Sequence, residues 1–158
     1  LLHYDCVQTL LIIELNAIIA VTVWMLVEDE PDIYEIILLM YDLIGVSGVA
    51  FTNGEDAIDW VDNYENLIPT SEPLQLALLD ILLPGDISGV DVGARLRGSP
   101  ALNDLVLVLM TAYHLTPDEE EAVLAASGAD MLVYKPLPRL NIFADALNEA
   151  VERRFGTD

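Results

Sequence analysis

Short apolar runs alternate with helical patterns along the chain from Val21 onward. Runs of strand length recur five times, and each is followed by a segment with apolar residues at helical spacing. This alternation is typical of a parallel sheet whose connections are helices. We therefore expect an α/β fold with a doubly wound, five-stranded parallel sheet and helices on both faces.

The alternation also places the individual elements. Strands are predicted at 21–27, 49–52, 74–79, 105–110 and 131–134, and helices at about 32–44, 54–64, 90–97, 117–127 and 140–155. The third strand is apolar apart from Gln75, as expected of a central strand buried on both faces. In the first helix, the residues expected to face inward are Ile33, Ile36, Ile37, Met40, Leu43 and Ile44.

The charge of the chain excludes several classes of partner. Its 158 residues carry 27 acidic against 6 basic side chains, a formal net charge of −21. Binding to DNA or RNA depends on a basic surface that neutralises phosphates, so we expect no direct nucleic-acid binding. An anionic membrane surface is disfavoured for the same reason.

The length suits one domain, which we place at 21–158.

The segment 1–20 is expected to be an accessory element. Leu10–Val27 approaches the length of a membrane span, but its second half reads as a strand, so we expect no span. Val7, Leu10, Leu11, Leu15, Ile18 and Ile19 could form one helical stripe, which would be buried on this domain or against a second copy in a homodimer. Strand pairing is the competing geometry.

The lone Cys6 and the absence of a recognisable secretory signal favour a cytoplasmic location.

Polar residues stand where four of the five predicted strands end. They are Glu28 and Asp29 after the first strand, Asp80 after the third, Thr111 after the fourth and Lys135 after the fifth. The carboxyl ends of parallel strands share one edge of the sheet, and ligands bind beyond that edge. We therefore expect these side chains to gather there. Lys135 is also the only lysine in the chain.

Three carboxylates at one edge repel one another, which raises their pKa values unless a cation intervenes. Mg²⁺ suits such a site because it takes oxygen ligands, commonly one or two carboxylates and a phosphate oxygen. It would also offset the charge that develops on a transferring phosphoryl group. Asp80 would then be a carboxylate nucleophile, and Lys135 and the Thr111 hydroxyl would contact phosphate oxygens.

Short motifs at these positions resemble the response regulator receiver family of two-component signalling, which has a flavodoxin-like fold. The motifs are Glu28-Asp29-Glu30-Pro31, Asn53-Gly54-Glu55-Asp56-Ala57, Leu78-Leu79-Asp80 with Pro84 and Gly89, Thr111-Ala112, and Gly128-Ala129-Asp130 ahead of Lys135-Pro136. They occur in the order of the family, and the resemblance covers the chain from about Val21 to Phe155.

The resemblance implies a role for each site residue and Mg²⁺ as the cofactor. Asp80 would be the phosphoacceptor. The metal would be held by Asp29 and Asp80, by the backbone carbonyl of Leu82, and by Glu28 nearby or through water. Thr111 and Lys135 would engage the phosphoryl group and relay its presence.

A receiver domain would be a signalling switch rather than a conventional enzyme, because it catalyses only its own phosphorylation and dephosphorylation. Its partners would be a sensor histidine kinase or a histidine phosphotransfer protein, and a downstream protein that the sequence does not identify. Two alternatives stay open: a receiver-like interaction module that is never phosphorylated, and a phosphatase with an aspartate nucleophile. The phosphatase would lack a general acid, since Leu82 stands where a second carboxylate is usual.

The chain departs from the family pattern at several positions. The loop between Asp80 and Gly89 is one residue longer than usual, and Leu83 replaces the usual methionine. Leu132 stands where an aromatic switch residue is common. Tyr134 lies two residues further on, which places it on the same face of the strand, and whether it substitutes is open.

Overall fold

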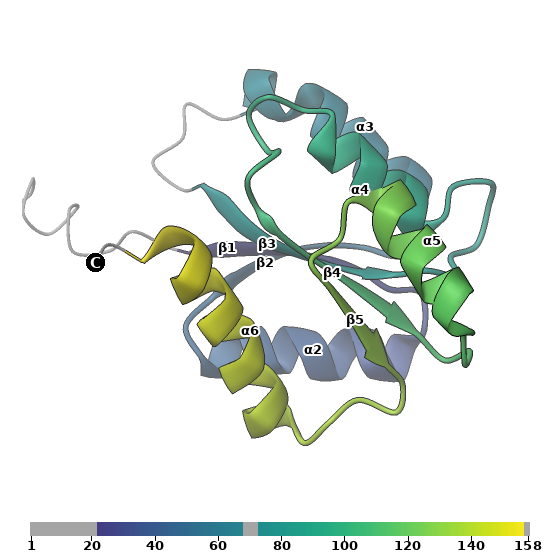
Figure 1. Cartoon of the computed structure of the whole chain (residues 1–158). Helices are drawn as coiled ribbons and strands as arrows, with labels where there is room; N and C mark the ends of the chain where they lie inside the picture. The colour runs from purple at the N-terminus through teal and green to yellow at the C-terminus, as the bar shows by residue number, and fades with distance from the viewer. Residues whose placement is uncertain (1–21, 68–72, 157–158) are drawn as a thin grey trace, which may run out of the picture.

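The structure, a computed structural model, describes residues 22–67 and 73–156 (Figure 1). The strands are β1 (Val23–Val27), β2 (Ser47–Phe51), β3 (Leu74–Asp80), β4 (Val106–Thr111) and β5 (Met131–Tyr134). The helices are α2 (Pro31–Leu43), α3 (Gly54–Leu67), α4 (Gly89–Arg97), α5 (Pro117–Ser127) and α6 (Leu140–Phe155). Strands and helices alternate throughout, which confirms the predicted order.

The five strands form one parallel sheet in the order β2-β1-β3-β4-β5. The order reverses at β1, because β2 lies on one side of it and β3 on the other. The carboxyl ends of β1 and β3 therefore flank the position where a doubly wound sheet opens a crevice for ligands. The predicted doubly wound five-stranded fold is confirmed.

Alternate residues of the strands feed two separate hydrophobic clusters. Trp24, Leu26, Leu76, Leu78, Val106, Val108 and Met110 pack with α2 and α6, whereas Met25, Val27, Ala77, Leu79, Leu107 and Leu109 pack with α3 and α4. Figure 1 shows α2 and α6 on one face of the sheet and α3, α4 and α5 on the other. Both faces of the central strand are covered, so β3 is apolar along nearly its whole length.

The inward face of the first helix differs from the prediction. Ile33, Ile37, Met40 and Ile44 do contact the core, but Leu43 is 73% exposed and Ile36 is also exposed. Tyr41 is buried instead, with its ring edge-on to Trp24 and its hydroxyl donating to the Met25 carbonyl at 3.2 Å. A tyrosine can occupy the core here because a backbone carbonyl accepts from its hydroxyl. Aliphatic spacing alone did not indicate that.

Other differences from the predicted elements are small. β2 begins two residues early, because Ser47 pairs with Val23 in the parallel register. α3 extends three residues beyond the predicted end, to Leu67. β4 begins one residue late, at Val106, and the carbonyl of the preceding Leu105 accepts a hydrogen bond from Arg97.

Two helices begin with reciprocal side-chain caps. In α4, Ser88 accepts from the Asp91 backbone N–H, and the Asp91 carboxylate accepts from the Ser88 N–H at 2.8 Å. In α5, Thr116 and Glu119 form the same arrangement. Such capping boxes satisfy amide groups that a helix leaves unpaired, so they define where each loop at the carboxyl edge ends.

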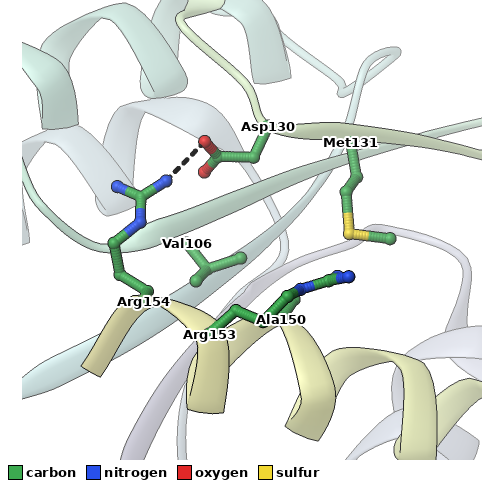
Figure 2. A pocket seen from close by; sticks show the side chains of 6 residues that line it. All are labelled: Val106, Asp130, Met131, Ala150, Arg153 and Arg154. Carbon is green, nitrogen blue, oxygen red and sulfur yellow. Dashed lines mark hydrogen bonds and ion pairs between the residues drawn. The ribbon is translucent and has the colours of Figure 1, made fainter. Parts of the chain in front are cut away.

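Asp130 joins several segments at the amino edge of the sheet, opposite the crevice. Its two carboxylate oxygens pair with Arg97 at 2.9 Å and Arg154 at 2.7 Å, and one of them also accepts from the Leu107 N–H. Figure 2 shows the Arg154 pair beside a cavity of about 200 Å³. Arg97 additionally donates to three backbone carbonyls, those of Gly128, Asn103 and Leu105. The Gly128-Ala129-Asp130 motif thus connects α4, α6 and the starts of β4 and β5.

The expectations for residues 1–20 fall outside the described residues. The accessory role of this segment, the domain start at 21 and the alternatives of burial on this domain or on a second copy therefore stay predictions. Among the helices of the described ranges, none is long and apolar enough to cross a membrane.

We predict that Asp130→Ala lowers the free energy of unfolding by about 1–3 kcal/mol, because two arginines and a backbone N–H lose a charged acceptor. Urea unfolding of the variant and the parent measures the difference. Asp104→Ala is the matched control, since Asp104 contacts Arg154 at 3.4 Å with a side chain that is 76% exposed, and should change stability by less than about 0.5 kcal/mol. Equal effects of the two substitutions would contradict a central role for Asp130.

Candidate functional site

The polar strand ends meet in one cavity at the carboxyl edge. The cavity has a volume of about 230 Å³, and its lining residues are Asp29, Glu30, Asp80, Leu82, Thr111, Ala112, Tyr113 and Lys135. They come from the ends of β1, β3, β4 and β5. Parallel register brings them together, because Asp80 lies beside Met110 and Thr111 beside Tyr134 across neighbouring strands.

The ammonium group of Lys135 lies among three carboxylates. Its Nζ is 2.9 Å from Glu28 Oε2, 2.9 Å from Glu30 Oε1 and 3.2 Å from Asp80 Oδ2. Glu28 is fully buried and Asp80 is 4% exposed, whereas the Glu30 side chain is 55% exposed. One ammonium therefore faces three acidic groups, and the cluster keeps an excess of negative charge.

Burial and charge change the acidity of both central groups. Burial raises the pKa of Asp80 to about 6, the negative charges of Glu28 and Asp29 add to this, and Lys135 opposes it. For Lys135, burial lowers the pKa, but hydrogen bonds to Glu28 and Glu30 and the charge of Asp80 outweigh burial and raise it above its ordinary value. Lys135 is therefore a permanent cation, and Asp80 is a carboxylate that gains from added positive charge.

Backbone geometry holds Asp80 and Thr111 at the bottom of the cavity. The Ile81 N–H donates to the Met110 carbonyl at 2.9 Å, which continues the pairing of β3 and β4 past Asp80. At the start of α4, a side chain at Gly89 would collide with the Asp80 carbonyl oxygen, so only glycine allows this approach. The Thr111 hydroxyl accepts from the Tyr113 N–H at 3.1 Å, and its hydrogen remains available to donate.

The residues of this cavity fit a hard divalent cation. Oxygen atoms of Glu28, Glu30 and Asp80 lie within 4.8 Å of one another. The buried carboxylate of Glu28 accepts from the Glu30 N–H at 3.0 Å, and its other oxygen, Oε2, lies 2.9 Å from the Lys135 ammonium. One ammonium cannot balance the carboxylates of Glu28, Glu30 and Asp80, and an oxygen-seeking cation such as Mg²⁺ would offset the remaining negative charge.

The structure brings together every residue that the sequence predicted for the site. Glu28, Asp29, Asp80, Leu82, Thr111 and Lys135 all lie in or directly beside the cavity. Asp29 lines the cavity, but the cluster of close carboxylate oxygens contains Glu30 in its place. Sequence reasoning gave no role to Glu30. The signal was present, because Glu30 is the third acidic residue at the end of β1 and immediately precedes Pro31.

Comparison with known proteins identifies the family. The sequence profile of the response regulator receiver domain matches residues 24–147. The chain belongs to the response regulator receiver family. Comparison with curated proteins found no significant match.

Solved receiver domains share the fold at low sequence identity. A CheY-like receiver domain from Methanospirillum hungatei JF-1 superposes with a TM-score of 0.69 at 17% identity, over 85% of this chain and 96% of its own. A putative response regulator from Chloroflexus aurantiacus J-10-fl gives 0.67 at 24% identity, over 83% and 98%. The receiver domain of a sensor histidine kinase from Pseudomonas aeruginosa PAO1 gives 0.65 at 20% identity, over 87% and 100%, and has a magnesium ion coordinated in its active site cleft.

In this receiver domain, Tyr134 binds the loop that follows Thr111. The Tyr134 hydroxyl donates to Glu120 of α5 and accepts from the Leu115 N–H at 3.4 Å, and its ring stacks on His114. The hydrogen bond to Glu120 raises the pKa of Tyr134. Leu132 packs against the cluster of α3 and α4. The aromatic residue that contacts the β4–α5 loop is therefore the one adjacent to Lys135.

We predict that Asp80→Asn stabilises the metal-free protein at pH 7.5. The pKa of Asp80 rises from an ordinary 3.8 to about 6 in the folded protein, so the folded state binds this proton more tightly than the unfolded state does. The folded protein therefore loses stability as the pH rises from about 3.8 to about 6 and Asp80 becomes charged. Removing the charge should recover about 1–3 kcal/mol at pH 7.5 and much less at pH 4.

Thermal and urea unfolding at the two pH values provide the measurement. Asp145→Asn is the matched control, because it removes one exposed carboxylate from α6, a helix that does not line the site cavity. A stability gain for Asp80→Asn that is the same at pH 4 and pH 7.5 would contradict a raised pKa.

Proposed function

We propose that this chain is a phosphoacceptor receiver domain that takes up a phosphoryl group on Asp80 with Mg²⁺ and signals through a conformational change. The observation that carries the proposal is the contact of 3.2 Å between Lys135 Nζ and a nearly buried Asp80, in a cavity that Thr111 also lines. A nucleophile, a fixed cation and a hydroxyl donor converge on one small volume.

Asp80 acts as the nucleophile in this proposal. One of its carboxylate oxygens forms a bond to phosphorus while the bond between phosphorus and the donor breaks, and the donor leaves with that electron pair. Asp80 must be ionised to attack, which the charge of Lys135 favours. Lys135 then pairs with a phosphoryl oxygen, and the Thr111 hydroxyl donates to another.

Mg²⁺, when bound, supplies positive charge that offsets the charge developing on the phosphoryl oxygens. The residues that would hold it are Glu28, Asp29, Asp80 and the backbone carbonyl of Leu82, and Glu30 lies close enough to Glu28 and Asp80 to share that role. Charge favours this set, because the cluster has more carboxylates than the single ammonium of Lys135 can balance.

The conformational signal would begin at Thr111. Its hydroxyl oxygen now accepts from the Tyr113 N–H, and a new bond to a phosphoryl oxygen would draw Thr111 into the cavity. The β4–α5 loop, which Tyr134 contacts at Leu115, would shift with it. The surface near α5 would then differ between the two states, which is what a downstream protein can read.

The expected phosphoryl donors are a sensor histidine kinase or a histidine phosphotransfer protein, and the expected location is the cytoplasm. Receiver domains of histidine kinases from Syntrophus aciditrophicus and Pseudomonas aeruginosa share the fold. The chain would catalyse only its own phosphorylation and dephosphorylation, so it would not be a conventional enzyme. A downstream protein and a homodimer are further proposed partners.

Intact-mass measurement after incubation with a small phosphodonor tests the proposal. The wild type should gain the mass of one phosphoryl group when Mg²⁺ is present and none when it is chelated. Asp80→Asn should gain none, whereas the Asp145→Asn control should match the wild type. No mass gain in the wild type would favour the interaction module that is never phosphorylated, and an equal gain in Asp80→Asn would exclude Asp80 as the acceptor.

We also predict slow loss of the phosphoryl group. Hydrolysis needs an aligned water, and the side chains at the cavity mouth are Leu82 and Tyr113, which are 54% and 62% exposed. Leucine cannot hydrogen-bond a water, and we expect the bulky ring of Tyr113, which lines the cavity, to shield the phosphoryl group. Leu82→Asn and Tyr113→Glu should therefore each shorten the half-life of the phosphorylated protein, followed by intact mass over time. Rapid decay in the parent that neither substitution changes would show that other groups control the lifetime.

A further inference from the structure

The start of α3 contacts the loop between β3 and α4, which lies 31 residues further along the chain. Glu55 Oε1 accepts a hydrogen bond from the Asp86 backbone N–H at 2.8 Å. A second contact lies beside it, because Ile87 packs on the face of Gly54. Hydrogen bonds from the N–H groups of Asp86 and Ile87, together with the backbone of Glu55 itself, lower the pKa of the Glu55 carboxyl.

The fit between these two segments is close. An added Cβ at Gly54 would come within 2.5 Å of Ile87 Cγ2, and one at Gly85 within 2.5 Å of Glu55 Oε1. Gly85 also has a φ of +91°, a conformation that glycine adopts readily. Two glycines at a single contact leave room for the backbone of the loop to reach the Glu55 carboxylate.

The loop that Glu55 holds carries one wall of the site. Residues 81–88 connect Asp80 to the first residue of α4, and Leu82 on this loop lines the cavity. The Gly89 N–H donates to the Ile81 carbonyl at 3.1 Å, and Ser88 forms the cap of α4, so both ends of the loop are anchored. Glu55 supplies an anchor in the middle of the loop, from a helix that does not itself line the cavity.

We propose that Glu55 is a positioning residue for the metal site: by binding the Asp86 N–H it holds the β3–α4 loop so that the Leu82 carbonyl faces the cavity. This inference rests on the proposed function, since it assigns the loop a metal-binding carbonyl. Glu55 acts through the loop and touches neither metal nor phosphoryl group. Residues that orient metal ligands from outside the coordination shell commonly matter for affinity nearly as much as the ligands do.

The test is Mg²⁺ affinity, measured by an amide chemical-shift titration of the whole chain. Glu55→Ala should bind Mg²⁺ about tenfold or more weakly than the wild type. Glu55→Gln keeps an oxygen that can accept from the Asp86 N–H and should recover most of the loss. Asp56→Asn removes the same charge one residue away, where the carboxylate caps Asn53 rather than the loop, and should bind like the wild type.

Hydrogen exchange of the Asp86 amide in the metal-free protein gives the second readout. It should accelerate in Glu55→Ala and return toward the wild-type rate in Glu55→Gln. Faster exchange with unchanged Mg²⁺ affinity would overturn the positioning role and leave the proposed function intact. Equal weakening in Glu55→Gln, Asp56→Asn and Glu55→Ala would overturn it as well, because charge alone would then explain the effect. A wild type that binds no Mg²⁺ would overturn the proposed function itself.

Discussion

One ammonium group, that of Lys135, is surrounded by the carboxylates of Glu28, Glu30 and Asp80. Two of these carboxylates are almost fully buried, and burying charge without a partner is costly. The fold accommodates these buried carboxylates because the connection from β4 through α5 to β5 brings Lys135 to the same edge of the sheet. The cluster nevertheless keeps an excess of negative charge, and this excess makes the cavity suited to a divalent cation.

The two edges of the sheet differ in the balance between acidic and basic side chains. At the amino edge, Arg97 and Arg154 both pair with Asp130, and Arg154 also contacts Asp104, so two cations meet two carboxylates. At the carboxyl edge, acidic groups outnumber the one cation. A balanced network contributes to stability, whereas at the carboxyl edge burial, together with the negative charge of Glu28, raises the pKa of Asp80. The chain has only 6 basic residues. Two of them, Arg97 and Arg154, lie at the amino edge and one, Lys135, at the carboxyl edge, and this distribution leaves the excess of negative charge at the carboxyl edge.

Loops at the carboxyl edge are held by contacts that differ in kind. The β3–α4 loop is anchored to the neighbouring helix α3 by Glu55, and the β4–α5 loop is bound by the hydroxyl of Tyr134. In the first anchor a carboxylate accepts from a backbone amide, and in the second the hydroxyl at the end of β5 also donates to Glu120 of α5, the helix that precedes this strand. A change at Thr111 would reach the second loop directly, so under the proposed function the region near α5 is where phosphorylation would alter the surface.

The sequence by itself determined the order of elements, the parallel sheet and the set of residues at its carboxyl edge. Apolar periodicity and strand-end positions are local properties, so Asp80, Thr111 and Lys135 could be named from the chain alone. Only the tertiary structure decided that Glu30 joins the cluster, that Tyr41 rather than Leu43 is buried, and that Glu55 reaches a loop 31 residues away. These contacts join side chains to groups on other elements of the fold. The spacing of residues within one element does not indicate which group on another element will lie beside a given side chain.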